Sequence, residues 1–361
     1  MQTEELLTIK PEEPDQGIYG AVSAYWDTFA KPIDGLGTFE DMICKIASIQ
    51  RTDKPDISRK ALVIMIADTG VTQEGVTQTG SSVTCSVAKL MGEGRSTVGV
   101  MTKGSGIKVI PVDVGMDTDE KIPGVIERKV ARGSGNITKE AAMTDDQCLA
   151  AIETGIDIVR TCCDEGIGII ATGEMGIGNT TTSTALYCAI TGENPKEVTG
   201  RGAGLSDEGL ARKIDAINRA LKYHGLSSAP EVILPSDALR MLSLLGGYDL
   251  AGLTGVFIGG AIYRIPVIID GFISAVAALT ASNIVPVCKK YMLASHVGKE
   301  KGCEGVLDRL GLKAVIDASM ALGEGSGAVM LFPLLDMVMN CYNNGTRFSD
   351  TAIEQYERFS K

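Results

Sequence analysis

Carboxylate side chains follow several short apolar segments of this sequence. Asp68, Asp113, Glu174 and Asp270 each come within three residues of the end of such a segment. A carboxylate in a cleft can remove a proton from a substrate or stabilise positive charge that develops there. Because open parallel sheets bind ligands outside the carboxyl ends of their strands, these residues predict a small-molecule site, although each taken singly also fits a turn or a helix cap.

Glu324 and His296 are two further candidates. Glu324 stands between Gly323 and Gly325, and glycines let a ligand approach closely. A carboxylate there can act as a general base when burial raises its pKa, although a turn residue facing water has the same pattern. His296 follows an apolar segment and fits either a catalytic role or an ordinary packed histidine.

The segment 173–182 (GEMGIGNTTT) is a glycine-rich loop between an apolar run and a helical pattern. Such a loop presents backbone N–H groups and the positive end of a helix dipole, which together bind phosphate. Asn179 occupies the position at which a P-loop nucleoside triphosphatase carries lysine, so hydrolysis of ATP or GTP is not expected. The pattern favours a single phosphate monoester.

A second glycine segment, 200–204 (GRGAG), is a weak dinucleotide-binding fingerprint, because Leu205 stands where the third glycine is required. Arg201 and Lys213, within and after this segment, are candidate partners for an anion. The alternative is that both are solvated charges on a helix face.

The elements that must position these residues are short strands and longer helices. The apolar segments are rich in β-branched residues, as buried parallel strands are. They are 61–67, 107–112, 167–171 and 266–269. Thr144 begins a capping box and Ser206 is an N-cap, each ahead of an apolar stripe with helical spacing. The alternation predicts an α/β fold with a parallel sheet flanked by helices, which is Rossmann-like.

The two ends of the chain lack such strands and have helical patterns. We therefore expect a large α/β catalytic domain over residues 56–330. We expect a smaller helical domain formed by residues 1–55 together with 331–361.

The composition limits the kinds of partner. The chain has 34 Lys and Arg against 45 Asp and Glu, a net charge of −11, which argues against nucleic acid or an anionic membrane. Nine scattered cysteines without a C-x-x-C pair and only two histidines predict no metal site. The first residues lack a secretory pattern, and polar residues interrupt the apolar segment 265–287, so we expect a cytoplasmic protein without a membrane span.

Five segments together carry a resemblance to one family. They are 173–186 (GEMGIGNTTTSTAL), 200–205 (GRGAGL), 207–214 (DEGLARKI), 270–273 (DGFI) and 322–327 (LGEGSG). The chain resembles the nicotinate-nucleotide:dimethylbenzimidazole phosphoribosyltransferase family over about residues 60–340, in order and at family-like spacing.

The resemblance implies an enzyme of cobamide (vitamin B12-type) biosynthesis. Such enzymes move the 5-phosphoribosyl group of nicotinate mononucleotide onto an aromatic base, releasing nicotinate and giving an α-riboside 5′-phosphate. The resemblance also implies a parallel α/β domain with a small helical domain from both chain ends, a dimer, and no cofactor.

The resemblance further assigns roles to individual residues. Glu324 is the base that deprotonates the acceptor, and the change from β to α configuration implies one direct displacement. Glu174 organises the ribose. The residues expected to bind the phosphate and the rest of the substrate are Gly176, Gly178, Asn179, Thr180, Arg201, Gly202, Lys213, Asp270 and His296.

The sequence departs from the family in the acceptor region. Members usually have histidine at the position of Thr69, and two glutamines that face the base are replaced by Ser81 and Ser86, which become the predicted acceptor contacts. Dimethylbenzimidazole, other benzimidazoles or purines, and phenols such as p-cresol stay open as acceptors. Relatives that use phenols pair with a paralogous subunit, so a homodimer and a heterodimer are both open. The alternative function is a non-catalytic, supporting subunit of such a heteromer.

Overall fold

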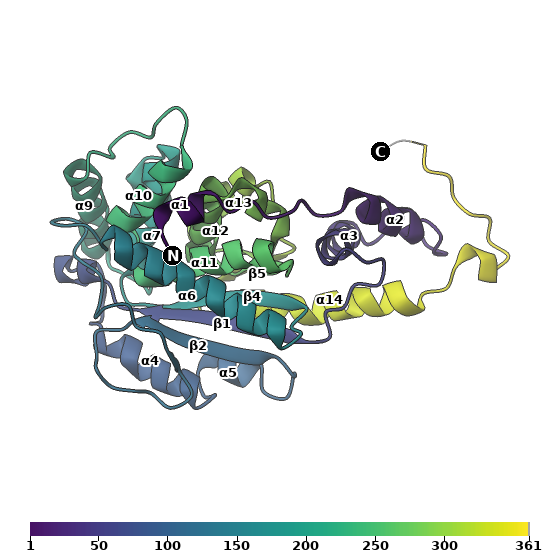
Figure 1. The fold of residues 1–361 in the computed structure, drawn as a ribbon, viewed down its shortest axis with the longest axis horizontal. Helices are drawn as coiled ribbons and strands as arrows, with labels where there is room; N and C mark the ends of the chain where they lie inside the picture. Colours follow the sequence, from purple (N-terminus) through teal and green to yellow (C-terminus); the bar gives the residue numbers. More distant parts are fainter. Residues whose placement is uncertain (360–361) are drawn as a thin grey trace.

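A six-stranded sheet organises the computed structural model, which describes residues 1–359 (Figure 1). The strand order is β3-β2-β1-β4-β5-β6, and all neighbouring pairs are parallel. A separate parallel pair joins β7 to β8. The strands are β1 (Lys60–Ala67), β2 (Lys108–Gly115), β3 (Ile126–Glu127), β4 (Ile169–Met175), β5 (Val267–Ile269), β6 (Met292–Ala294), β7 (His296–Gly298) and β8 (Ile316–Met320). The predicted α/β fold is confirmed.

Two strands continue beyond the apolar segments that predict them. Asp113 lies within β2 and Glu174 within β4, so neither carboxylate follows its strand as expected. Both strands continue because the central strand β1 pairs with them further along, with Ile66 opposite Asp113 and Met65 opposite Glu174. Hydropathy therefore marks the start of these strands better than their end.

Helices lie on both faces of the sheet (Figure 1). They are α1 (Thr3–Leu7), α2 (Gln16–Trp26), α3 (Thr38–Gln50), α4 (Ser82–Gly92), α5 (Thr97–Met101), α6 (Asp145–Asp164), α7 (Asn179–Thr191), α8 (Pro195–Val198), α9 (Asp207–Tyr223), α10 (Pro235–Leu245), α11 (Tyr248–Tyr263), α12 (Phe272–Ile284), α13 (Cys303–Leu310) and α14 (Ser326–Asn344). The capping box at Thr144 begins α6, and Ser206 caps α9, as predicted. Within residues 1–359, no helix combines the length and apolar character needed to cross a membrane.

Helix α11 is the most deeply enclosed of the helices near the site. It packs against α6, α12 and β1, and every residue from Tyr248 to Ala261 is buried. The contact with α6 is close because Gly255 faces the carbonyl of Ile152, where no β-carbon would fit. A side chain carried by the first turn of α11 is therefore held rigidly.

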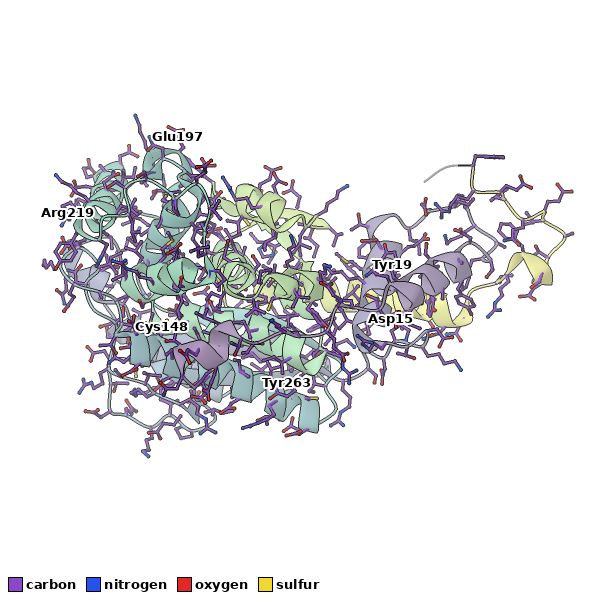
Figure 2. The ribbon with its side chains drawn as sticks, turned by 45° about the horizontal axis from the view of Figure 1, so that its top comes forward. Asp15, Tyr19, Cys148, Glu197, Arg219 and Tyr263 are labelled. Carbon is purple, nitrogen blue, oxygen red and sulfur yellow. The ribbon has the colours of Figure 1, made fainter. Side chains whose placement is uncertain are left out.

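Helices α2, α3 and the C-terminal part of α14 form a helical arm that extends from the sheet, and Figure 2 shows the labelled Asp15 and Tyr19 on it. Helix α1 lies instead on the main body, where the N-terminal amine of Met1 pairs with Glu153 of α6 at 2.8 Å (Figure 1). Helices α2 and α3 pack on each other, and α14 reaches α3. Phe29 and Arg347 form an isolated antiparallel bridge between the two ends. Contacts between distant sequence segments thus hold the arm together.

Helix α14 runs without interruption from the sheet into the arm. The expected boundary between residues 330 and 331 falls inside this helix. Residues 360 and 361, the end of the expected small domain, lie outside the described residues. The division into two domains stays a prediction.

Candidate active site

One cavity at the carboxyl edge of the sheet collects most of the predicted site residues. It lies beside the ends of β4 and β5 and the first turns of α7 and α12. The predicted residues that line it are Glu174, Gly176, Gly178, Asn179, Thr180, Arg201, Gly202, Lys213, Asp270, His296 and Glu324. The general expectation of ligands at the ends of parallel strands agrees with this location.

Glu324 reaches the cavity from a tight glycine loop ahead of α14. Its backbone is left-handed, with φ of 59°, which is unusual for a residue with a side chain. Its Oε2 accepts a hydrogen bond of 3.1 Å from the backbone N–H of Val98, at the start of α5. The residue is 9% exposed, so it is sheltered and still borders the cavity.

Asp270 holds the loop that carries Glu324. Its Oδ1 accepts hydrogen bonds from the N–H groups of Gly327 at 2.9 Å and Ala328 at 3.0 Å, and its Oδ2 accepts one from Gly325 at 3.2 Å. These N–H groups belong to the first turn of α14, where they have no partner within the helix. Burial raises the pKa of Asp270 to about 7, against the lowering effect of these hydrogen bonds. Both oxygens are thus engaged by backbone rather than free for substrate.

Glu174 lies against the same glycine loop. A β-carbon at Gly323 would be 2.5 Å from Oε1 of Glu174, so this close approach needs glycine at 323. The side-chain amide of Asn179 donates to Oε2 of Glu174. Burial, with the neighbouring carboxylates Asp249 and Asp270, raises the pKa of Glu174 to about 8. Glu174 is therefore protonated at neutral pH unless a positive charge enters the cavity.

Lys213 supplies a buried positive charge to the other side of the cavity. Its Nζ donates to Oγ1 of Thr180 at 2.8 Å and to the carbonyl of Gly200 at 3.2 Å, and the residue is 1% exposed. Burial lowers its pKa to about 8. Within the part of the chain that the structure describes, no ion pair neutralises it. The carboxylate of Glu300, which also lines the cavity, acts against this lowering without forming an ion pair with Lys213. A buried ammonium outside a direct ion pair is a site for an anion.

The glycine loop 176–178 lies beside Lys213 and opens α7. Gly178, with φ of 95°, is the N-cap of α7. The N–H groups of Asn179 and Thr181 donate to the carbonyls of Gly176 and Gly178, at 3.2 and 2.9 Å, so the loop offers an anion chiefly the positive end of the helix dipole. Thr69 supports this loop because its hydroxyl donates to the carbonyl of Ile177 at 2.8 Å. The loop, Thr180 and Lys213 together match the phosphate-binding arrangement that the sequence predicts.

Arg201 and Gly202 border the same region in different ways. The guanidinium of Arg201 is engaged by Asp207 and by the carbonyl of Leu205 at 2.9 Å, so it is less available than Lys213. Gly202 leaves space next to Lys213, since a β-carbon there would lie 3.2 Å from Oγ1 of Thr180. An anion bound to Lys213 therefore has room beside position 202.

His296 lines the cavity and is 4% exposed. Its Nδ1 shares a hydrogen bond of 2.9 Å with the hydroxyl of Ser295, and burial lowers its pKa, which favours the neutral ring. A β-carbon at Gly327 would overlap this ring. A neutral imidazole here is suited to hydrogen bonding with a polar substrate group.

The comparisons with known proteins agree with this geometry. A family model described as Phosphoribosyltransferase matches residues 11–353. The chain belongs to this phosphoribosyltransferase family. It is 42% identical, over 92% of each chain, to the nicotinate-nucleotide–dimethylbenzimidazole phosphoribosyltransferase of Ruminiclostridium cellulolyticum. It is 40% identical, again over 92% of each chain, to the enzyme of that name from Acetivibrio thermocellus.

Solved structures give the same result. The crystal structure of CobT from Thermus thermophilus is similar with a TM-score of 0.87 and 31% identity, covering 94% of this chain and 100% of that one. The chain is thus a phosphoribosyltransferase, as its resemblance implied. None of these relatives supports the alternative of a non-catalytic subunit.

Ser81 and Ser86 are not brought to the cavity of this phosphoribosyltransferase. Neither lines it: Ser81 is the N-cap of α4, and Ser86 lies in its second turn, exposed, with its hydroxyl donating to the carbonyl of Ser82 at 3.0 Å. Gln78 and Thr79, just before α4, line the cavity instead. Both are polar, which was a usable signal, but the resemblance assigned the acceptor contacts to the serines that follow them. The acceptor role of Ser81 and Ser86 stays a prediction.

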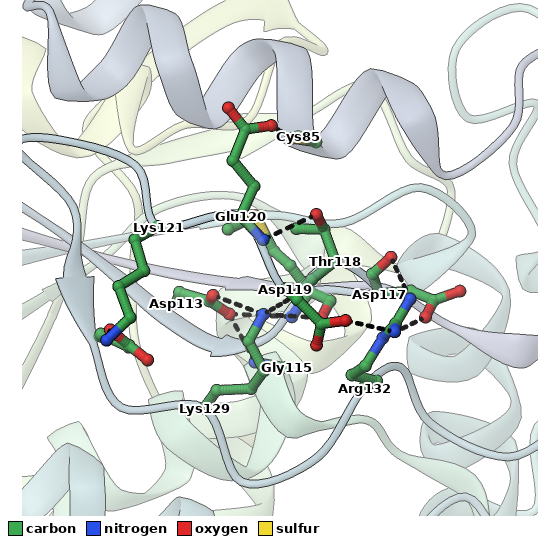
Figure 3. Close-up of polar contacts among 12 residues, drawn as sticks. Cys85, Asp113, Gly115, Asp117, Thr118, Asp119, Glu120, Lys121, Lys129 and Arg132 are labelled. Atoms are coloured by element: carbon green, nitrogen blue, oxygen red, sulfur yellow. Dashed lines mark hydrogen bonds and ion pairs between the residues drawn. The ribbon is translucent and has the colours of Figure 1, made fainter.

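Asp113 serves the loop after β2 rather than the cavity (Figure 3). Nζ of Lys129 lies 2.8 Å from Oδ2 of Asp113 and also donates to the carbonyls of Met116 and Thr118, at 2.9 and 2.6 Å. Arg132 binds two further carboxylates of this loop. Asp113 is thus paired with Lys129, a partner that its position in the sequence did not reveal.

Proposed function

We propose that this phosphoribosyltransferase moves the phosphoribosyl group of nicotinate mononucleotide onto an aromatic acceptor, giving an α-riboside 5′-phosphate and nicotinate for cobamide synthesis. The names of its relatives support this donor, with dimethylbenzimidazole as acceptor. The observation that carries the proposal is that Glu324, Glu174 and the buried Lys213 line one cavity.

The phosphate of the donor binds at Lys213. The ammonium and the hydroxyl of Thr180 offer donors to the phosphate oxygens, and the positive end of the α7 dipole lies beside them. This contact fixes one end of the ribose and directs the anomeric carbon toward the carboxylate side of the cavity, where Glu174 lies.

The transfer is a single displacement. The acceptor atom attacks C1′ as the bond from C1′ to the pyridinium nitrogen breaks, and that electron pair returns to the ring, which leaves as neutral pyridine nitrogen. The acceptor loses its proton to the carboxylate of Glu324. The cationic donor favours the ionised form of Glu174, which then stabilises positive charge on the ribose.

The acceptor is an azole or a phenol. Glu324 can take a proton from nitrogen of a benzimidazole or from oxygen of a phenol, so the base does not choose between them. Thr77, Gln78 and Thr79 line the cavity and are the polar groups from the segment ahead of α4 that can select the acceptor. We rank dimethylbenzimidazole first because the relatives carry its name.

We also propose that the enzyme works as a dimer, either of itself or with a paralogue. Large apolar side chains are exposed on α14 and on the neighbouring α5, including Met337 at 62% and Val100 at 62%. Exposed large apolar side chains on neighbouring elements are a feature of subunit interfaces. The molar mass measured by light scattering, alone and with a paralogous chain, tests this part.

The function is tested by incubating the purified enzyme with nicotinate mononucleotide and, separately, dimethylbenzimidazole, adenine and p-cresol. Mass spectrometry and chromatography then measure nicotinate and each α-riboside 5′-phosphate. We expect equal amounts of nicotinate and product with at least one acceptor. No product with any of them, in a sample that binds nicotinate mononucleotide, would contradict the proposal.

A further inference from the structure

We infer that Asp249 is a positioning residue of the transfer reaction, acting through Asn179 on Glu174. This inference rests on the proposed function. Asn179 and Glu174 line the cavity, whereas Asp249 lies behind them and does not. Asp249 therefore acts on the reaction through another side chain and not by touching substrate.

The amide nitrogen of Asn179 connects two buried carboxyl groups. Nδ2 donates to Oδ2 of Asp249 at 2.9 Å and also to Oε2 of Glu174. An amide nitrogen has two N–H bonds, so it can serve one carboxyl group with each. Asp249 thereby fixes which way the amide of Asn179 faces, and the amide fixes Glu174.

Asp249 is well suited to act as the fixed end of this chain of contacts. It is fully buried in the first turn of α11, the enclosed helix packed on α6 and β1. A β-carbon at Gly247 would lie 2.8 Å from its Oδ1, and one at Gly176 would lie 3.2 Å from its Oδ2. Glycine at both positions therefore lets the backbone pack closely around the carboxyl group of Asp249.

The arrangement is also electrostatically unusual. The charged groups that act on Glu174 are Asp249 of α11, Asp270 after β5 and Glu300 after β7, and Asp68 acts on Asp249. No ion pair joins a lysine or arginine to Asp249 or Glu174 in residues 1–359. A neutral amide that donates to both carboxyl groups is what allows them to lie so near each other.

The substitution Asp249→Asn separates position from charge. Asparagine keeps an oxygen that can accept from Asn179 and removes one negative charge near Glu174. Asp249→Ala removes the acceptor altogether and leaves an N–H of Asn179 without its partner. Asp237→Asn is a matched control, since Asp237 also lies in the first turn of a helix, α10, and outside the cavity.

The first measurement is steady-state transfer over a pH series. We expect Asp249→Ala to lower kcat about tenfold to a hundredfold while KM for nicotinate mononucleotide changes by less than about threefold. We expect Asp249→Asn to keep most of kcat and the acidic limb of its kcat–pH profile to move to lower pH. Asp237→Asn should match the wild type. Wild-type kcat and pH profile in both Asp249 variants would overturn the inference.

A second measurement does not depend on turnover. The carboxyl carbon of Glu174, labelled with ¹³C and assigned through Glu174→Gln, is titrated by NMR. In Asp249→Asn its midpoint is expected at lower pH than in the wild type, and an unchanged midpoint would overturn the inference even if Asp249→Ala fails to fold. If the wild type transfers phosphoribosyl to no acceptor, the proposed function fails. The titration still tests whether Asp249 acts on Glu174.

Discussion

The carboxylate of Glu324 accepts a hydrogen bond of 3.1 Å from the backbone N–H of Val98, which lies 226 residues earlier in the chain. Val98 belongs to the first turn of α5, whose N-cap Ser96 accepts from Gly99. The N–H group sets the direction of the carboxylate. The proposed base is thus held from two sides, by α5 at its oxygen and by Asp270 through the N–H group of the following residue, Gly325.

Asp270→Asn should impair catalysis more than substrate binding. An asparagine cannot accept with both side-chain atoms, so either Gly325 or the pair Gly327 and Ala328 loses its acceptor, and the loop carrying Glu324 loosens. We expect kcat to fall about tenfold to a hundredfold, with little change in KM for nicotinate mononucleotide. Steady-state kinetics measure this, and a change in KM alone would show that Asp270 instead binds substrate.

Lys213→Gln should weaken binding of the donor, nicotinate mononucleotide. Removing a buried ammonium that faces a phosphate costs about 2 kcal/mol or more, which is roughly thirtyfold in KM for nicotinate mononucleotide. The riboside that lacks the phosphate should show little difference between variant and wild type. Lys222→Gln, in the last turn of the same helix, is the control. An equal loss for the nucleotide and the riboside would contradict phosphate binding at Lys213.

The glycine at 323 should be required for the contact between the two carboxylate segments. Gly323→Ala adds a carbon 2.5 Å from Oε1 of Glu174 at a backbone φ of 84°. Gly104→Ala is the matched control, because Gly104 has φ of 78° and nothing within 4 Å. The free energy of unfolding of the control should fall by about 1–2 kcal/mol, the cost of a left-handed backbone for alanine. That of Gly323→Ala should fall by about 1–3 kcal/mol more, because of the added clash. Urea unfolding of both variants measures the difference, and equal losses would mean that the clash is relieved.

The sequence predicted the site's location well because the signals are local. A short apolar strand followed by a carboxylate placed Asp270 at the sheet edge, and a carboxylate between glycines identified Glu324. Both patterns reflect the conformation of a few consecutive residues. The roles given to these residues by the resemblance stay predictions.

The sequence could not predict which partners these residues have. The pattern around Asp270 is the same whether it binds substrate or backbone, and only the fold brings Gly325 to it. Asp249 was missed because an acidic residue in a helix's first turn is common, although one that starts an otherwise apolar helix was a usable signal. Strand β8 was missed because its residues, Ile316–Met320, are largely exposed and alternate between apolar and polar instead of forming a continuous apolar run.

The free enzyme should become less stable as pH rises through the neutral range. The pKa of Glu174 is raised from 4.5 to about 8, so the folded state keeps a proton that the unfolded state releases above 4.5. Its contribution to stability is therefore complete below about pH 4.5 and declines until about pH 8, and Asp270 acts in the same direction. Urea unfolding at several pH values in this range measures how the free energy of unfolding changes with pH, and this change should be smaller in Glu174→Gln than in the wild type. An equal change with pH in both proteins would contradict a buried, protonated Glu174.

The central claim, that Glu324 takes the acceptor's proton as phosphoribosyl is transferred, is tested most directly by Glu324→Gln in single-turnover experiments. The variant keeps the shape of the side chain and its contact with Val98, and loses the basic oxygen. We expect nicotinate release to fall by about a thousandfold or more at saturating dimethylbenzimidazole, with the dissociation constant for nicotinate mononucleotide close to the wild-type value. Nicotinate release at the wild-type rate in a folded, donor-binding variant would contradict the claim.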